Sequence, residues 1–194
     1  MTDCAESIDR ARAFRVLLEA TSHPGKVLAL PPAIDVPAPL HVTAAAICLV
    51  LCDYDTPLWL APSLGIRPVV DYLRFHTGAP ITGDTGSARF LICDPAAAAE
   101  ALREAERGSA EYPDRSATLL VQVPAFARGL ALSLTGPGIK NEQKFTAAEL
   151  DRTFWAALQR NHRLFPLGCD FIFASPGEVA ALPRSTQVAI EGHS

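Results

Sequence analysis

Short apolar segments alternate with longer helical patterns along the whole chain, and this alternation restricts the possible fold more than any other feature. The strand-like segments cover 26–30, 56–61, 89–93, 117–123, 129–135, 171–174 and 179–182, and the helical patterns cover 7–20, 42–52, 68–75, 95–107 and 146–161. Such alternation is typical of proteins whose helices cover a central sheet. We therefore expect an α/β fold, a three-layer sandwich formed as a single domain by residues 1–194.

Two pairs of strand-like segments are close enough in sequence to form hairpins. The first pair is 117–123 with 129–135, and the second is 171–174 with 179–182. Hairpins join antiparallel strands, whereas strands linked by helices usually run parallel. The sequence therefore predicts a mixed sheet.

Three helices carry signals at the residue level. Asp94 and Pro95 suit the N-cap and the first turn of the helix that follows, and Thr146 with Glu149 forms a capping-box pattern for the helix over 146–161. The first helix, over 7–20, places five apolar side chains on one stripe, which we expect to face the core: Ile8, Ala11, Phe14, Leu17 and Leu18.

Charge and cysteine content exclude several classes of protein. The formal net charge is −4, and the basic residues are scattered rather than gathered in the stripe that a nucleic-acid groove requires. The longest apolar run, 42–52, is too short to span a bilayer, and the N-terminus has no apolar core of a signal peptide. The five cysteines show no disulfide-framework spacing. A cytoplasmic protein with reduced thiols, binding neither nucleic acid nor membrane, fits these observations.

Four loops combine Gly or Pro with polar residues at the ends of apolar elements. They are DYDTPLW (53–59), LRFHTGAP (73–80), LTGPGI (134–139) and LPRST (182–186). Loops at element ends commonly carry binding and catalytic residues. However, the chain has no Walker loop, no HExxH, no CxxC and no GxSxG motif. The loops therefore suggest a site without supplying a complete catalyst.

Each loop offers candidate ligand- or partner-binding residues together with a simpler structural role. His76, beside Arg74 and Thr77, either binds a ligand or partner or caps the end of its helix. Arg184, followed by two hydroxyl residues, either holds a phosphate or carboxylate or forms a surface salt bridge.

The remaining candidates have the same two readings. Asp53 and Asp55 are either paired carboxylates for metal or base chemistry or parts of an Asx-type turn, which we favour. Gly136 and Gly138 provide half of a dinucleotide fingerprint, but the third glycine is missing, so a bare turn is the better interpretation. We expect no metal site in this chain.

Seven sequence segments, taken in order, resemble the H subunit of bacterial carbon–phosphorus lyase. The segments are AFRVLLEATSHPGKV, DYDTPLWL, LRFHTGAP, ATLLVQV, LTGPGI, FPLGCDFIF and LPRST, and together they extend over nearly the whole chain, from about residue 14 to 186. Each segment alone is weak evidence, whereas seven segments in the same order identify the family.

The resemblance implies a role in the breakdown of alkylphosphonates. In that family the H subunit joins the G, I and J subunits in a core complex. Subunits G, H and I, with an associated L protein, transfer the phosphonate onto the ribose of ATP and displace adenine. The J subunit then breaks the carbon–phosphorus bond by radical chemistry. ATP and the alkylphosphonate are thus substrates of the complex.

The resemblance also implies a fold and a set of partners. The H subunit looks like a truncated relative of the pyridoxal-phosphate-dependent transferases that has lost its cofactor, so we expect no cofactor bound by this chain. It is expected to pair with itself as a homodimer when isolated and to contact the I subunit directly. The alternative that the residues leave open is a stand-alone small-molecule-binding enzyme of α/β fold.

Overall fold

The computed structural model describes residues 2–30 and 35–191, with side chains from Arg10 onward in the first helix. The helices are α1 (Thr2–Ser22), α2 (Val42–Leu51), α3 (Arg67–Thr77), α4 (Pro95–Glu104) and α5 (Arg152–His162), with 3₁₀ turns η1 (Thr85–Ser87) and η2 (Pro113–Arg115). The strands are β1 (Leu28–Ala29), β2 (Leu58–Leu60), β3 (Phe90–Cys93), β4 (Thr118–Gln122), β5 (Leu132–Thr135), β6 (Gln143–Phe145), β7 (Asp170–Ser175), β8 (Glu178–Leu182) and β9 (Gln187–Ile190).

The strands form a six-stranded mixed sheet and a smaller antiparallel sheet. In the large sheet the order is β1-β8-β7-β4-β3-β2. Strands β2, β3, β4 and β7 are parallel, whereas β8 runs antiparallel to both β7 and β1. The small sheet has the order β6-β5-β9. The expected α/β class and mixed sheet are confirmed, and the second sheet was not foreseen.

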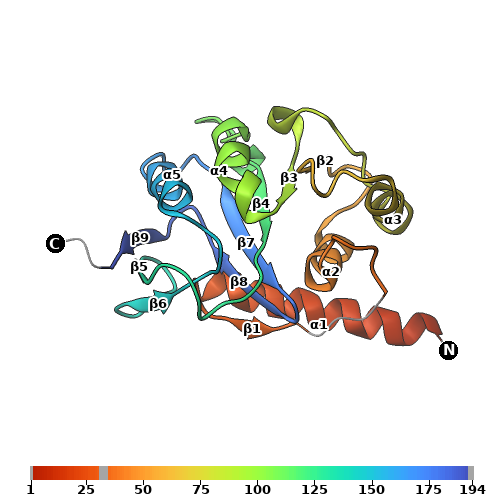
Figure 1. Ribbon diagram of the computed structural model, residues 1–194, viewed down its shortest axis with the longest axis horizontal. Helices are drawn as coiled ribbons and strands as arrows, with labels where there is room; N and C mark the ends of the chain where they lie inside the picture. The colour runs from red at the N-terminus through yellow and green to blue at the C-terminus, as the bar shows by residue number, and fades with distance from the viewer. Residues whose placement is uncertain (1, 31–34, 192–194) are drawn as a thin grey trace.

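Helices cover both faces of the large sheet. Alternate side chains of each parallel strand enter two different core clusters, because successive residues of a strand point to opposite faces. Leu119 and Phe173 pack with α4 and α5, whereas Leu120 and Ile172 pack with α1, α2 and α3. Figure 1 shows α4 and α5 above the sheet and α1 running below it. The small sheet adds Leu132, Leu134, Phe145 and Val188 to the cluster under α4 and α5.

One of the two predicted hairpins is present and the other is wrong. Strands β7 and β8 form an antiparallel pair with Ala174 opposite Val179. Strands β4 and β5 do not pair, because β4 lies between β3 and β7 while β5 lies in the other sheet. Parallel pairing on both sides leaves β4 with no free edge, so the chain leaves the large sheet after β4.

The predicted start of the last helix is also wrong. Helix α5 begins at Arg152, and Asp151 is its N-cap, with the side chain accepting a hydrogen bond from the backbone N–H of Phe154 at 2.9 Å. Thr146 directly follows β6, and Glu149 has a left-handed backbone conformation with φ of 64°. That conformation cannot form part of a helix, so the Thr146–Glu149 pattern caps nothing.

The first helix buries a different stripe from the one predicted. Ala13, Leu17 and Ala20 are buried, whereas Phe14 and Leu18 are 46% and 51% exposed. Ala11 is also exposed, and the side chain of Ile8 lies outside the described residues. Helix α1 packs against α2 and β8, and small alanines allow that close approach better than Phe14 would.

The helix after β3 starts as predicted. The Asp94 side chain accepts a hydrogen bond from the backbone N–H of Ala97 at 3.0 Å, and Pro95 occupies the first turn. The helix ends at Glu104, three residues before the predicted end. Asp94 is therefore fixed at the point where β3 stops, which places its carboxylate at the carboxyl edge of the parallel strands.

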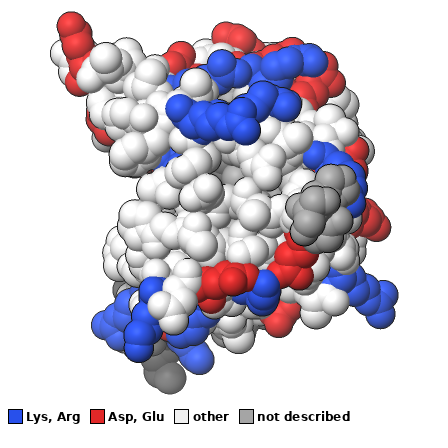
Figure 2. All heavy atoms as spheres, turned by 90° about the vertical axis from the view of Figure 1, so that its left-hand side faces the viewer, with Lys and Arg blue, Asp and Glu red and all other residues white. Residues whose placement is uncertain are grey.

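Figure 2 views the side of the molecule that carries the small sheet and α5. Basic side chains gather near the top and bottom of this face, with acidic side chains among them, and the middle is uncharged. Arg160 in the last turn of α5 and Arg163 directly after the helix are exposed, whereas Asn161 between them is buried. This face thus carries separate charged groups rather than one continuous basic stripe.

Candidate functional site

The first two loops of the sequence lie side by side. The turn after α2 contacts the end of α3, because a Cβ placed on Gly78 would lie 3.9 Å from the Cβ of Tyr54. The backbone N–H of Leu58 donates to the carbonyl of Pro80 at 2.8 Å, which ties the second loop to the start of β2. Both loops are at the amino edge of the parallel strands.

His76, Arg74 and Thr77 have different environments at the end of α3. Arg74 and His76 are exposed, and the imidazole packs in a tilted contact with Tyr72, 4.4 Å between ring centroids, and edge-to-face with Phe75 at 5.0 Å. The Thr77 hydroxyl donates to the carbonyl of Leu73 and accepts from the backbone N–H of Ala79. Its hydrogen bonds therefore stabilise the C-terminal end of α3. Arg74 and His76 therefore face solvent at the end of α3.

The acidic residues of the first loop form a turn. The Asp53 carboxylate accepts hydrogen bonds from the backbone N–H of Asp55 at 3.0 Å and from the hydroxyl of Thr56 at 2.8 Å. The favoured interpretation of Asp53 as an Asx-type turn is confirmed. Asp55 is exposed beside it.

The other two loops also lie side by side. Gly136 directly follows β5, and a Cβ placed on it would lie 3.0 Å from the carbonyl oxygen of Ser185. The residues that follow form a turn in which the backbone N–H of Ile139 donates to the carbonyl of Gly136 at 3.1 Å. The interpretation of Gly136 and Gly138 as a bare turn is therefore confirmed.

Arg184 is held inside the protein by internal partners. Its guanidinium donates to both carboxylate oxygens of Asp170, at 3.1 Å from Nε and 2.5 Å from Nη2, and Nη1 donates to the carbonyl of Pro113 at 2.7 Å. Only 15% of the side chain is exposed. Hydrogen bonding to Asp170 raises the pKa of Arg184. The hydroxyl of Thr186 is buried too. The cation proposed to hold a ligand is thus already paired.

The two pairs of loops do not converge on one site. One pair flanks β2 and the other follows β8, and these strands are four positions apart in the sheet. At about 4.8 Å between neighbouring strands, the separation is about 19 Å. The candidates Asp55, Arg74 and His76 therefore form one group, and Gly136, Gly138 and Arg184 form another.

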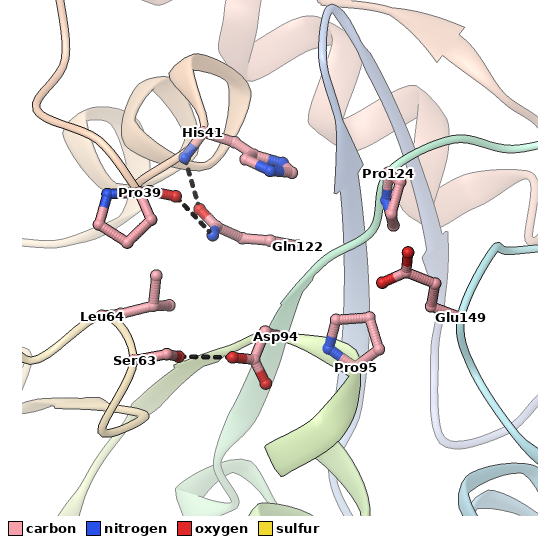
Figure 3. Close-up of a pocket in the computed structure, with 9 residues that line it drawn as sticks. All are labelled: Pro39, His41, Ser63, Leu64, Asp94, Pro95, Gln122, Pro124 and Glu149. Carbon is pink, nitrogen blue, oxygen red and sulfur yellow. Dashed lines mark hydrogen bonds between the residues drawn. The ribbon is translucent and has the colours of Figure 1, made fainter.

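A pocket lies at the opposite edge of the sheet, where β2, β3 and β4 end. Its volume is about 190 Å³, and it is lined by Pro39, His41, Ser63, Leu64, Asp94, Pro95, Gln122, Pro124 and Glu149 (Figure 3). In α/β sheets, ligands bind outside the carboxyl ends of the strands. Three adjacent strands contribute residues here, so the parallel arrangement itself builds the pocket.

Gln122 and His41 form the upper wall of the pocket in Figure 3. Gln122 is only 4% exposed, and its amide oxygen accepts from the backbone N–H of His41 at 2.6 Å while its nitrogen donates to the carbonyl of Pro39 at 3.3 Å. These bonds fix the entry to α2. The Nδ1 atom of His41 is buried and has no hydrogen-bond partner among the described residues.

Two carboxylates complete the opposite walls. Asp94 accepts from the hydroxyl of Ser63 at 2.5 Å as well as from the N-terminus of α4. Glu149 is exposed at the mouth, and Figure 3 shows its carboxylate turned toward the pocket. Its backbone φ of 64° is uncommon for a residue other than glycine. Two carboxylates thus line one small space, with His41 at its border.

The pocket does not have the residues of a metal or pyridoxal-phosphate site. Within residues 2–30 and 35–191, no three His, Cys, Asp or Glu side chains are grouped to hold a metal ion. Pyridoxal phosphate requires a lysine for its Schiff base, and no lysine lines the pocket. Lys26 and Lys144 are instead paired with exposed glutamates. The donor set therefore does not fit that cofactor.

Sequence reasoning missed this pocket. His41, Ser63, Gln122 and Glu149 were not predicted as site residues, and Asp94 was predicted only as a helix cap. The available signal was that each residue ends or follows a strand or precedes a helix, but only the strand order shows which of these ends are neighbours. Among the described residues, no helix is long and apolar enough to cross a membrane.

Known proteins similar to this chain share one metabolic context. Residues 4–189 match the family described as bacterial phosphonate metabolism protein (PhnH). A relative from Rhizobium meliloti (strain 1021), named alpha-D-ribose 1-methylphosphonate 5-triphosphate synthase subunit PhnH, is 38% identical over 181 residues, covering 92% of this chain and 89% of the relative. A putative C-P lyase subunit protein HtxG from Stutzerimonas stutzeri is 33% identical, covering 93% of this chain and 86% of the relative.

Proposed function

Because this chain belongs to the bacterial phosphonate metabolism protein (PhnH) family, we propose that it is a subunit of a carbon–phosphorus lyase complex that transfers phosphonate onto the ribose of ATP with release of adenine. The observation that carries this proposal is the family match over residues 4–189. The name of the 38%-identical relative, a subunit of the corresponding synthase, supports it.

The proposal includes specific partners. The chain works with the G, I and L subunits in the transfer step, contacts the I subunit directly, and belongs to a core complex that also contains the J subunit. It is inactive alone, binds no cofactor, acts in the cytoplasm and forms a homodimer when isolated. Its relation to the pyridoxal-phosphate transferase fold belongs to the same proposal.

The exposed group Asp55, Arg74 and His76 supports a role in partner contact. These side chains lie at the end of α3 and in an Asx-type turn, and the neighbouring Tyr54 and Phe75 are 75% and 84% exposed. Exposed aromatic residues next to an arginine are enriched in protein interfaces. Gly136, Gly138 and Arg184 form the second group. The glycines have no side chain and the Arg184 guanidinium is paired with Asp170, so a partner would contact the backbone of this turn or residues next to it.

Reconstitution tests the proposed function. The purified chain is incubated with ATP and methylphosphonate, alone and after co-expression with the G, I and L subunits, and adenine is measured by chromatography. We expect no adenine from the chain alone and adenine from the complex. Adenine release by the isolated chain would support the stand-alone enzyme, and failure to co-purify with G and I would contradict the subunit proposal.

Growth on methylphosphonate tests the partner-binding residues. In a strain lacking its own H subunit, Arg74→Ala and His76→Ala are expected to slow growth while leaving thermal unfolding unchanged, because both side chains are exposed. Arg67→Ala is the matched control, since Arg67 starts the same helix and its side chain is 92% exposed. Normal growth and assembly of both variants would exclude a role for this group.

The stand-alone small-molecule-binding enzyme is the second candidate. The pocket at the carboxyl edge of β2, β3 and β4 favours it, because this is where α/β enzymes place their substrates. The Ser63 hydroxyl donates to Asp94 in this pocket, but among the described residues no histidine is hydrogen-bonded to that hydroxyl as in a Ser–His nucleophile–base pair. The reconstitution experiment separates the two candidates.

A further inference from the structure

We propose that the pocket lined by His41, Ser63, Asp94, Gln122 and Glu149 binds a ring-sized polyhydroxylated group, specifically a pentose ring with two adjacent hydroxyls. The pocket lies at the carboxyl ends of three adjacent parallel strands. Its residues come from five separate loops or helix starts, so the folded sheet, rather than any local motif, assembles them.

The size of the pocket limits the ligand. Pockets for drug-sized ligands have volumes of roughly 300 to 1,000 Å³, whereas this pocket has about 190 Å³. One sugar ring fits a space of this size, and a whole nucleotide does not. Leu64 and three prolines supply apolar walls against which the ring can pack.

The polar groups of the pocket mainly accept hydrogen bonds. Among the described residues, no hydrogen bond or ion pair reaches the Glu149 carboxylate, which leaves both oxygens available. Asp94 uses its oxygens for Ser63 and the α4 N-terminus but retains further lone pairs. A ligand with several O–H donors matches such acceptors, and a carboxylate that binds ribose hydroxyls is a recurring arrangement in α/β proteins.

The free acceptors of the pocket, rather than His41 or Gln122, set the kind of ligand. The Nδ1 atom of His41 is buried and has no partner among the described residues, so His41 borders the pocket without offering this atom to a ligand. The Gln122 amide is already fully engaged and holds the His41 backbone in place. A metal ion is disfavoured because Asp94, Glu149 and His41 are not grouped as metal ligands.

Charge excludes phosphate and phosphonate from the same space. Asp94 and Glu149 line the pocket, and no lysine or arginine does. Like charges at close range are mutually repulsive, so a phosphonate or triphosphate group must lie outside. The choice of ribose among pentoses rests on the proposed function, in which the ribose of ATP is the group modified.

Titration by NMR tests the proposal on the full-length chain. Methyl β-D-ribofuranoside is added to ¹⁵N-labelled protein, and the amide signals of Ser63, Asp94 and Gln122 are followed. We expect saturable shifts with a dissociation constant on the order of 1 to 10 mM, typical for a ligand of this size. The 2,3-dideoxy analogue is expected to bind at least about tenfold more weakly, because it lacks the donors. Methylphosphonate is expected to leave these signals unshifted.

Two variants separate the pocket from the rest of the surface. Glu149→Gln keeps the size of the side chain and is expected to weaken ribofuranoside binding about tenfold, as loss of a charged acceptor does. Glu111→Gln is the control, because Glu111 is an exposed acid before β4 at the opposite edge. Absence of shifts at concentrations well above the expected constant, equal binding by Glu149→Gln, or binding of methylphosphonate in the pocket would overturn the proposal.

The ribofuranoside titration and the reconstitution experiment can succeed or fail independently of each other. Adenine release by the reconstituted complex, with no ribofuranoside binding in the pocket, would remove the pocket proposal and leave the subunit role intact. Ribofuranoside binding without assembly or adenine release would support the pocket proposal and contradict the subunit role.

Discussion

Arg184 shows how a residue chosen for ligand binding can have a structural role. Sequence alone places a cation next to two hydroxyls, which suits an anion. In the folded chain its planar guanidinium forms a two-point contact with Asp170 at the start of β7 and reaches the carbonyl of Pro113 in η2. Three segments of the amino edge therefore meet at one side chain, which a lysine could not join in the same way.

We expect Arg184→Ala to lower the free energy of unfolding by about 1 to 3 kcal/mol. The partly buried Asp170 carboxylate and the carbonyl of Pro113 lose their hydrogen-bond donor in this variant. Arg184→Lys is expected to recover only part of the loss. Urea unfolding measures both. Arg103→Ala, which removes an exposed pair with Glu100, is the control and should change stability by less than about 1 kcal/mol. Equal effects of the Arg184→Ala and Arg103→Ala variants would contradict the structural role.

Cysteine residues provide a second prediction at this scale. Cys48, Cys52, Cys93 and Cys169 are free and buried, and burial raises the pKa of Cys169 from 9.0 to about 12. Burial also raises the pKa of Cys93. Unfolding lets Cys93 and Cys169 ionise at their usual pKa, so the unfolded chain binds fewer protons above about pH 9, and stability falls as the pH rises from there toward about 12.

Thiol reactivity measures this protection. In a Cys4→Ser variant, the four buried thiols are expected to react with a disulfide reagent at pH 8 only slowly in the native protein and fully after unfolding in guanidinium, because burial keeps the reagent away from the sulfur atoms. Native stability at pH 10 should be lower than at pH 8. Rapid stoichiometric reaction of the native protein, or equal stability at the two pH values, would show that the thiols are accessible.

At the scale of elements, the two N-caps differ in how well sequence predicted them. Asp94 directly follows a strand and precedes a proline, and both features lead to the same helix start. Before α5 two starts compete, Thr146 with Glu149 and Asp151. Strand β6 and the bridge between Phe126 and Ala147 hold residues 143–147 in extended structure, so tertiary pairing selects the later cap.

Substitution of the caps tests this selection. Asp151→Ala is expected to lower the free energy of unfolding by about 1 kcal/mol, because the N–H of Phe154 loses its acceptor. Thr146→Val keeps the shape of a half-buried side chain that caps nothing and should cost less than about 0.5 kcal/mol. Thermal or urea unfolding of both variants gives the comparison, and a larger loss for Thr146→Val would restore the capping-box prediction.

The buried stripe of the first helix could not be chosen from its hydrophobic pattern alone. Its periodicity predicts a helix correctly, but two overlapping stripes are available, one with Phe14 and Leu18 and one with Ala13, Leu17 and Ala20. Only the proximity of α2 and β8 selects the second. A hydrophobic pattern therefore identifies the element, whereas the neighbouring elements decide which stripe is buried.

At the scale of the whole molecule, the turn after β5 joins the small sheet to the first helix. Gly138 has φ of 83°, and a Cβ placed there would lie 2.3 Å from the carbonyl oxygen of Ser22 and 2.9 Å from Pro24. The turn is thus pressed against the end of α1, far away in sequence. Neither contact can be inferred from the GPG letters, which fit any tight turn.

We expect Gly138→Ala to destabilise the protein by more than about 2 kcal/mol, because the left-handed conformation and the backbone clash act together. Gly177→Ala is the matched control. Gly177 has a similar φ of 85°, but nothing lies within 4 Å of its added Cβ, so only about 1 kcal/mol of conformational strain is expected. Chemical unfolding at pH 7 compares the two variants. Similar losses in the free energy of unfolding would mean that the end of α1 can move to make room for the added methyl group.

The sequence by itself determined the α/β class, the place of most helices and strands, and the family, because helix and strand periodicity and ordered motifs are local properties of the chain. Tertiary structure alone decided that β4 lies inside the large sheet, that Arg184 binds Asp170, and that the four loops form two separate pairs. It also brought His41, Asp94, Gln122 and Glu149 around one pocket. Strand order depends on which distant segments exchange hydrogen bonds and bury each other's apolar faces, and no local pattern records that choice.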